Sequence, residues 1–129
     1  MHSFNLVAAQ ILLGLESVGD NAESHCLAII TRCYEINHSI PTYAEFTEAF
    51  NKLLYVSAIV IDGENVTIAK FGRDIINNAR SKASAEIQLK ELLELLYKEL
   101  SGYKLKSMCN RTVWTETQYQ QAVEAIANI

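Results

Sequence analysis

Three cysteines and three histidines are the residues of this chain whose types could support nucleophilic or metal chemistry. His25 and Cys26 are adjacent, so on a helix their side chains point about 100° apart, which is poor geometry for a base and its nucleophile. Cys33 and His38 flank a predicted helix end and could approach each other, but no third, orienting group accompanies them. The sequence lacks C-x-x-C and H-x-x-x-H spacings. We therefore expect no catalytic residue, metal or cofactor, and interpret the cysteines as free thiols of a reducing cytoplasm.

A second candidate chemistry comes from basic residues that alternate with aromatic ones late in the chain. Such a surface can hold a nucleic-acid backbone and stack on bases. The secondary basic cluster consists of Lys98, Lys104, Lys106 and Arg111. Tyr97, Tyr103 and Trp114 are interspersed among them. The set is scattered, so a solvated surface with aromatic residues anchoring the tail is the competing interpretation.

Helices are expected to position most of these side chains, because apolar residues recur at helical spacing. A first helix is predicted over Ser3 to Val18, with Ser3 as its cap and an apolar surface wide enough to be covered on several sides. A second is predicted to begin between Asn21 and Ser24. It should end near Asn37, since the residue before a proline disfavours helical geometry.

The middle of the chain combines a capped helix with a hairpin. Thr42 and Glu45 have the spacing of a capping box, which predicts a helix start. From Ala58 the apolar period changes to two, which predicts two short strands around the sequence DGEN. The expected partners across this hairpin are Ile59 and Ile61 on one strand and Val66 and Ile68 on the other.

The C-terminal part is predicted to be helical again, with an irregular tail before the last helix. One helix is expected from Phe71 to Ser81, and a long one from Ser84 to Gly102. Thr115 and Gln118 form a second capping-box pattern before the last. The long helix carries a leucine seam at near-heptad spacing, formed by Leu89, Leu93, Leu96 and Leu100. We expect either a homodimer, through this seam or the N-terminal helix, or packing of the seam on the first helix of its own chain.

Length and composition favour a single domain, 1–129, of mainly α class with a small β-hairpin. Its parts are an N-terminal helix (1–20), a core (24–80) and two C-terminal helices (84–129). No apolar run approaches the roughly 20 residues that cross a bilayer, so we expect a cytoplasmic protein without membrane association.

Two phrases of the core resemble the winged helix-turn-helix superfamily of bacterial regulators. IPTYAEFTEAFNKLL is similar to its second and third helices, and AIVIDGENVTIAKFGRDII is similar to its strand, wing, strand and following helix. The resemblance covers under half of the chain. It implies a winged-helix core and a DNA-reading face at Thr47, Asn51, Lys52 and Tyr55. In such a face Asn51 would pair with an adenine edge and Lys52 would meet a phosphate or a guanine.

Charge opposes this implied function. The chain has a net charge of −4. Residues 24–79 contain four basic and six acidic side chains, and Asp62 and Glu64 stand at the wing tip. Binding to duplex DNA depends largely on neutralised phosphates. Two non-enzymatic functions therefore remain open: a DNA-binding regulator, and a protein-protein interaction or oligomerisation module that has lost DNA binding.

Overall fold

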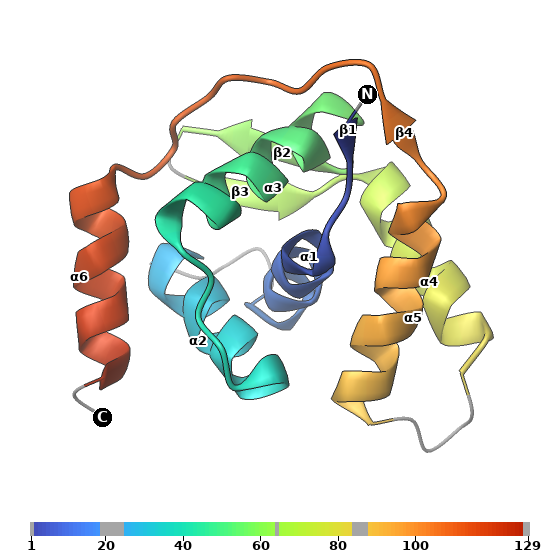
Figure 1. The fold of residues 1–129 in the computed structure, drawn as a ribbon, viewed down its shortest axis with the longest axis horizontal. Coiled ribbons are helices and arrows are strands. Elements are labelled where there is room, and N and C mark those ends of the chain that lie inside the picture. The colour runs from blue at the N-terminus through green and yellow to red at the C-terminus, as the bar shows by residue number, and fades with distance from the viewer. Residues whose placement is uncertain (1, 19–24, 64, 84–87, 128–129) are drawn as a thin grey trace.

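A computed structural model describes residues 2–18, 25–63, 65–83 and 88–127 (Figure 1). This part of the chain is mainly helical, with two small antiparallel sheets. The helices are α1 (Leu6–Val18), α2 (His25–Asn37), α3 (Tyr43–Tyr55), α4 (Lys70–Ser81), α5 (Leu89–Ser101) and α6 (Glu116–Ala127). The strands are β1 (His2–Ser3), β2 (Ile59–Asp62), β3 (Asn65–Ile68) and β4 (Lys104–Leu105).

Helix α1 lies at the centre of the molecule (Figure 1). It packs against α2, α3, α5 and the hairpin strand β3. Ala8, Ala9, Ile11 and Leu12 are all 0% exposed, which confirms that the first helix is covered on several sides. Its apolar surface is used within the chain and is not available as the predicted dimer interface.

The start of α1 differs from the prediction. Ser3 belongs to β1, where it pairs with Lys104 of β4, and therefore does not cap the helix. Helix α1 begins at Leu6, and the Asn5 side-chain oxygen accepts a hydrogen bond from the Ala8 amide at 3.4 Å. Two-residue strands are too short to show an alternating pattern, so β1 and β4 have no signal in the sequence.

The capped helix and the hairpin are confirmed. The Thr42 hydroxyl accepts from the Glu45 amide at 3.1 Å, and the Thr42 amide donates to the Glu45 carboxylate at 3.0 Å. The bond from the Thr42 amide to the carboxylate lowers the pKa of Glu45. In the hairpin, β2 and β3 pair in the predicted register, with Ile59 opposite Ile68 and Ile61 opposite Val66.

A close backbone approach fixes α4 against the hairpin. The Ala69 amide donates to the Ala58 carbonyl at 2.9 Å. Gly72 lies so near that a Cβ atom there would be 2.3 Å from the Ala58 oxygen. A side chain at position 72 would force the two elements apart, so this position of α4 requires glycine.

The leucine seam packs inside one chain. Helix α5 lies against α1 and α4, and Leu93, Leu96 and Leu100 are at most 1% exposed. Leu89, by contrast, is 39% exposed. The three buried leucines therefore make the alternative contact, with the first helix of the same chain, and are not exposed for a partner; the homodimer itself stays a prediction.

Candidate binding surfaces on α3 and α6

The outer side of α3 is crossed by residues 106–115, which we call the strap. The strap runs from β4 to α6 over α3 (Figure 1). Most of its residues are exposed, while Val113 and Trp114 are half-buried. The strap thus connects two ends of the molecule across the helix that the resemblance assigns to DNA reading.

Asn51 binds the strap backbone through both ends of its amide. Its side-chain oxygen accepts from the Arg111 amide at 2.8 Å, and its nitrogen donates to the Arg111 carbonyl at 3.1 Å. The same nitrogen also donates to the Thr47 carbonyl at 2.9 Å. The Asn51 carbonyl in turn accepts from the Cys109 amide at 3.2 Å. With 4% exposure, Asn51 has its hydrogen-bonding capacity used inside the chain.

The Lys52 ammonium is also bonded within the chain, to a residue near the N-terminus. Its ammonium donates to the Ser3 carbonyl at 2.9 Å and forms an ion pair with Glu48 at 2.8 Å. Lys52 is 5% exposed, which is unusual for lysine and is made possible by these two partners. Segments from both ends of the chain thus cover Asn51 and Lys52, whereas the reading face that the resemblance implies stays a prediction.

The other two predicted reading residues lie at the edges of this covered region. Thr47 is half-buried and lines a narrow crevice between α3 and the strap, together with Arg111 and Trp114. Tyr55, at the end of α3, is 43% exposed. The structure thus brings Thr47 and Asn51 together by a hydrogen bond and leaves Tyr55 in solvent.

The strap is anchored near α6 by aromatic packing. The Trp114 ring lies 5.9 Å from that of Phe46 and 5.7 Å from that of Phe50, between ring centroids. The Tyr43 hydroxyl donates to the Trp114 carbonyl at 2.9 Å. These contacts agree with the interpretation in which late aromatic residues attach the tail to the core. No short-range pattern predicts them, although a tryptophan in an otherwise polar tail is a usable signal.

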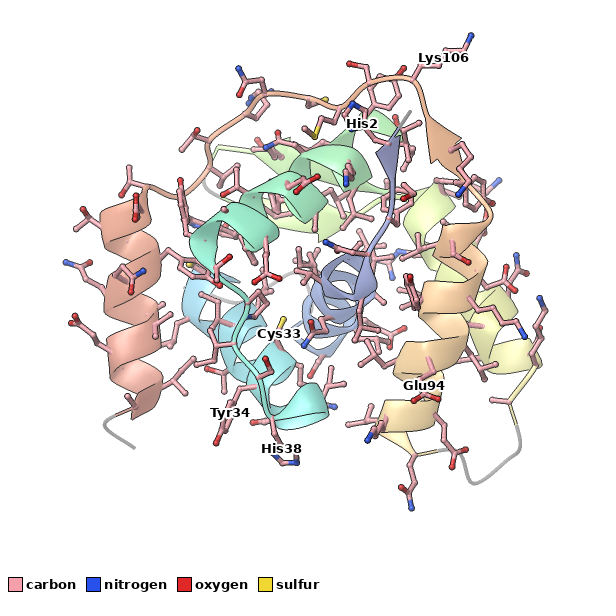
Figure 2. The ribbon with its side chains drawn as sticks, viewed as in Figure 1. His2, Cys33, Tyr34, His38, Glu94 and Lys106 are labelled. Carbon is pink, nitrogen blue, oxygen red and sulfur yellow. The ribbon has the colours of Figure 1, made fainter. Side chains whose placement is uncertain are left out.

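Members of the secondary basic cluster come from different elements. Lys98 lies on α5, Lys104 on β4, and Lys106 and Arg111 on the strap; all four are exposed. Lys106 points away from the body of the molecule (Figure 2). Among the described residues none of the four has an ion-pair partner.

A groove extends along α6. We define the α6 groove as two adjoining hollows of about 630 and 480 Å³, which share Ile40 and Val123. The larger lies between α2 and α6 and is mainly apolar. Its lining residues are Thr31, Tyr34, Glu35, Ile40, Val123, Ile126 and Ala127. The smaller continues past the start of α3 to Glu116 and Gln120. Sequence reasoning missed this groove, because it depends on how α2 and α6 pack.

The candidate thiol and imidazole groups are not assembled into a reactive site. Burial raises the pKa of Cys26 to about 11 and that of Cys33 to about 12, so both remain protonated thiols at neutral pH. Cys33 points into the core, whereas His38 is exposed and meets the ring of Tyr34 (Figure 2). Within the described ranges no three His, Cys, Asp or Glu residues are grouped as a metal site would require.

Comparison with known proteins yields no match: no family profile, no curated protein and no solved structure is significantly similar to this chain. Among the described helices none has the length and apolar character needed to span a bilayer.

Proposed function

We propose that this chain is a non-enzymatic interaction module of winged-helix type that binds another protein rather than DNA. The observation that carries the proposal is the burial of Asn51 and Lys52 under the strap and β1. A side chain whose donors and acceptors are already paired within the chain cannot read a base edge without breaking those bonds. The α6 groove, in contrast, is open to solvent.

Charge supports the same proposal. Residues 70–111 hold nine of the eleven basic side chains and five of the fifteen acidic ones, so the rest of the chain holds two basic and ten acidic residues. Helix α3 lies in the acidic part, and so do Asp62 and the α2 and α6 helices. Phosphate backbones are repelled where α3 would have to dock.

A titration with mixed-sequence duplex DNA tests the proposal. At 50 mM salt we expect no saturable binding to the wild-type chain. Saturable binding that falls steeply between about 50 and 200 mM salt would overturn it, because that slope measures phosphates neutralised by the protein.

A specific observation favours a second candidate, a DNA-binding regulator closed by its own strap. Adenine presents one donor, N6–H, and one acceptor, N7, in the major groove, and asparagine reads them through both ends of its amide. The backbone of Arg111 offers Asn51 the same combination, an N–H donor at 2.8 Å and a carbonyl acceptor at 3.1 Å. In this candidate the strap occupies the position of a base edge and must move before DNA binds.

Releasing the strap separates the two candidates. Trp114→Ala removes the aromatic anchor, while Trp114→Phe retains an apolar ring as the matched control. If the second candidate holds, Trp114→Ala binds adenine-containing duplex at least about tenfold more tightly than the control, and adding Asn51→Ala abolishes the gain. Equal, absent binding by both variants supports the interaction module.

A further inference from the structure

The geometry points to a partner for the α6 groove: a cationic amphipathic helix of another protein, with its apolar face in the groove and its Lys or Arg side chains at the glutamates of α6. This inference rests on the proposed function and deepens it by naming the surface and the class of partner.

The apolar part of the groove fits one face of a helix. Val123 and Ile126 are half-buried against α2, and Tyr34 is 44% exposed at the opposite wall. Helix α6 has 12 residues, which corresponds to a length of about 18 Å. A partner helix of roughly three turns would match that length and place side chains at positions i, i+4 and i+7 over these residues.

The rim of the groove defines the charge of the partner. All charged residues of α6 are acidic, namely Glu116 and Glu124, and both are exposed. Glu116 lines the smaller hollow, and Glu124 follows Val123 and borders the adjoining outer surface of α6. Neither has an ion-pair partner among the described residues. At the far wall Glu35 is paired with Arg32 at 2.8 Å. The free glutamates therefore leave the rim negative, which favours a cationic partner.

Other classes of ligand fit this surface less well. A nucleic acid would meet the same glutamates with its own negative charge. A small polar molecule is normally held by convergent polar groups. In the larger hollow the Thr31 hydroxyl already donates to the Leu27 carbonyl and Glu35 is paired with Arg32, so few polar groups are left for such a molecule. An apolar face with acidic edges is complementary to an amphipathic helix with basic edges.

A labelled peptide provides the direct test. The probe is a fluorescein-labelled 14-residue helix of leucine and lysine, with leucines on one face, titrated with the full chain at 50 mM salt and followed by anisotropy. We expect saturable binding, weakened at least about tenfold by Val123→Arg, which adds bulk and positive charge to the groove floor. A peptide with glutamate in place of lysine should not bind.

Matched charge variants separate the groove from general attraction. Glu116→Gln/Glu124→Gln should weaken binding roughly fivefold, whereas Glu91→Gln/Glu94→Gln on α5 changes the net charge equally and should stay within about twofold. Equal weakening by both pairs, or wild-type affinity in Val123→Arg, would overturn the inference. Circular dichroism and the melting temperature check folding, and Ile126→Ser is the second groove variant should Val123→Arg unfold.

Two further measurements show whether the proposed groove partner or the proposed interaction module is wrong. If light scattering shows a dimer that Val123→Arg abolishes, the occupant is a second copy and the partner proposed here is wrong. The DNA titration depends on Asn51, Lys52 and the strap, which the groove variants leave unchanged. Absent peptide binding with absent DNA binding therefore rejects the groove alone, while DNA binding rejects the interaction module itself.

Discussion

The covered side of α3 and the open α6 groove differ in how far residue type agrees with exposure to solvent. On α3 the polar side chains Asn51 and Lys52 are closed off by the strap and by β1. On α6 apolar side chains such as Val123 and Ile126 are only half-covered. Residue type alone thus gives a misleading picture of both surfaces: the polar face is bonded within the fold, and the apolar face stays partly exposed.

Among the substitutions that test this comparison, Asn51→Ala is expected to change the free energy of unfolding most. It removes the side-chain amide that pairs with the backbone of Arg111 and leaves the partly buried amide and carbonyl of Arg111 without these partners. We expect the free energy of unfolding to fall by about 2–4 kcal/mol, as measured by urea denaturation. Tyr55→Ala, on the exposed end of the same helix, is the control and should stay within about 0.5 kcal/mol. Equal stability of the two variants would show that the strap contributes nothing to the closed face.

Trp114→Ala is expected to cost slightly less, about 2–3 kcal/mol, because the ring is half-buried and packs on Phe46 and Phe50. The strap should then open more often, and modification of the Cys109 thiol, which lies on it, should accelerate. Cys33, which is buried on α2, should react no faster. If both thiols accelerate together, the anchor stabilises the whole fold and not the strap in particular.

Alkaline pH tests the core beneath α2. The pKa values of Cys26 and Cys33 are raised from 9.0 to about 11 and 12 by burial. Below pH 9 both thiols are protonated in the folded and unfolded chains, so stability is unaffected. Above pH 9 the unfolded chain releases these protons first, and stability should decline by on the order of 1 kcal/mol per thiol by pH 10. Denaturation at pH 7, 9 and 10 measures this decline. A Cys26→Ala/Cys33→Ala variant should show a shallower slope, and an unchanged slope would contradict the assignment.

The smallest effect is expected in the groove. Tyr34 is 44% exposed and makes an edge contact with His38. Tyr34→Ala should change the free energy of unfolding by no more than about 0.5 kcal/mol, while weakening the binding of the cationic peptide. A large loss of stability would mean that this wall belongs to the core and is not a binding surface.

Local features of the fold could be predicted from the sequence, because each depends on residues close together in the chain. Both capping boxes are present, the second with the Thr115 hydroxyl accepting from the Gln118 amide at 3.2 Å. The hairpin register is correct, and α4 and α6 begin close to their expected positions. Starts expected within 19–24 and 84–87 lie outside the described residues.

The covered face could not be predicted, because its partners are distant in sequence and lie in the strap or in the two-residue strand β1. Asn51 bonds to a residue 60 positions away, and Lys52 to one 49 positions away. Every residue has the same backbone carbonyl, and every residue except proline has the amide N–H. A sequence pattern therefore cannot show which of these groups will accept or donate a bond. The asparagine in the middle of α3 was an indication, because asparagine is unfavourable inside a helix and its side chain tends to bond to backbone groups.

The central position of α1 has a consequence for synthesis. This helix is synthesised before α5, which covers one of its sides and comes roughly 80 residues later, a delay of several seconds at typical translation rates of about 5–20 residues per second. During that interval the nascent chain carries an apolar helix without its full set of neighbours. Chaperones that shield such segments are therefore expected to assist this protein co-translationally, and truncation before α5 should yield aggregates in place of a smaller folded unit.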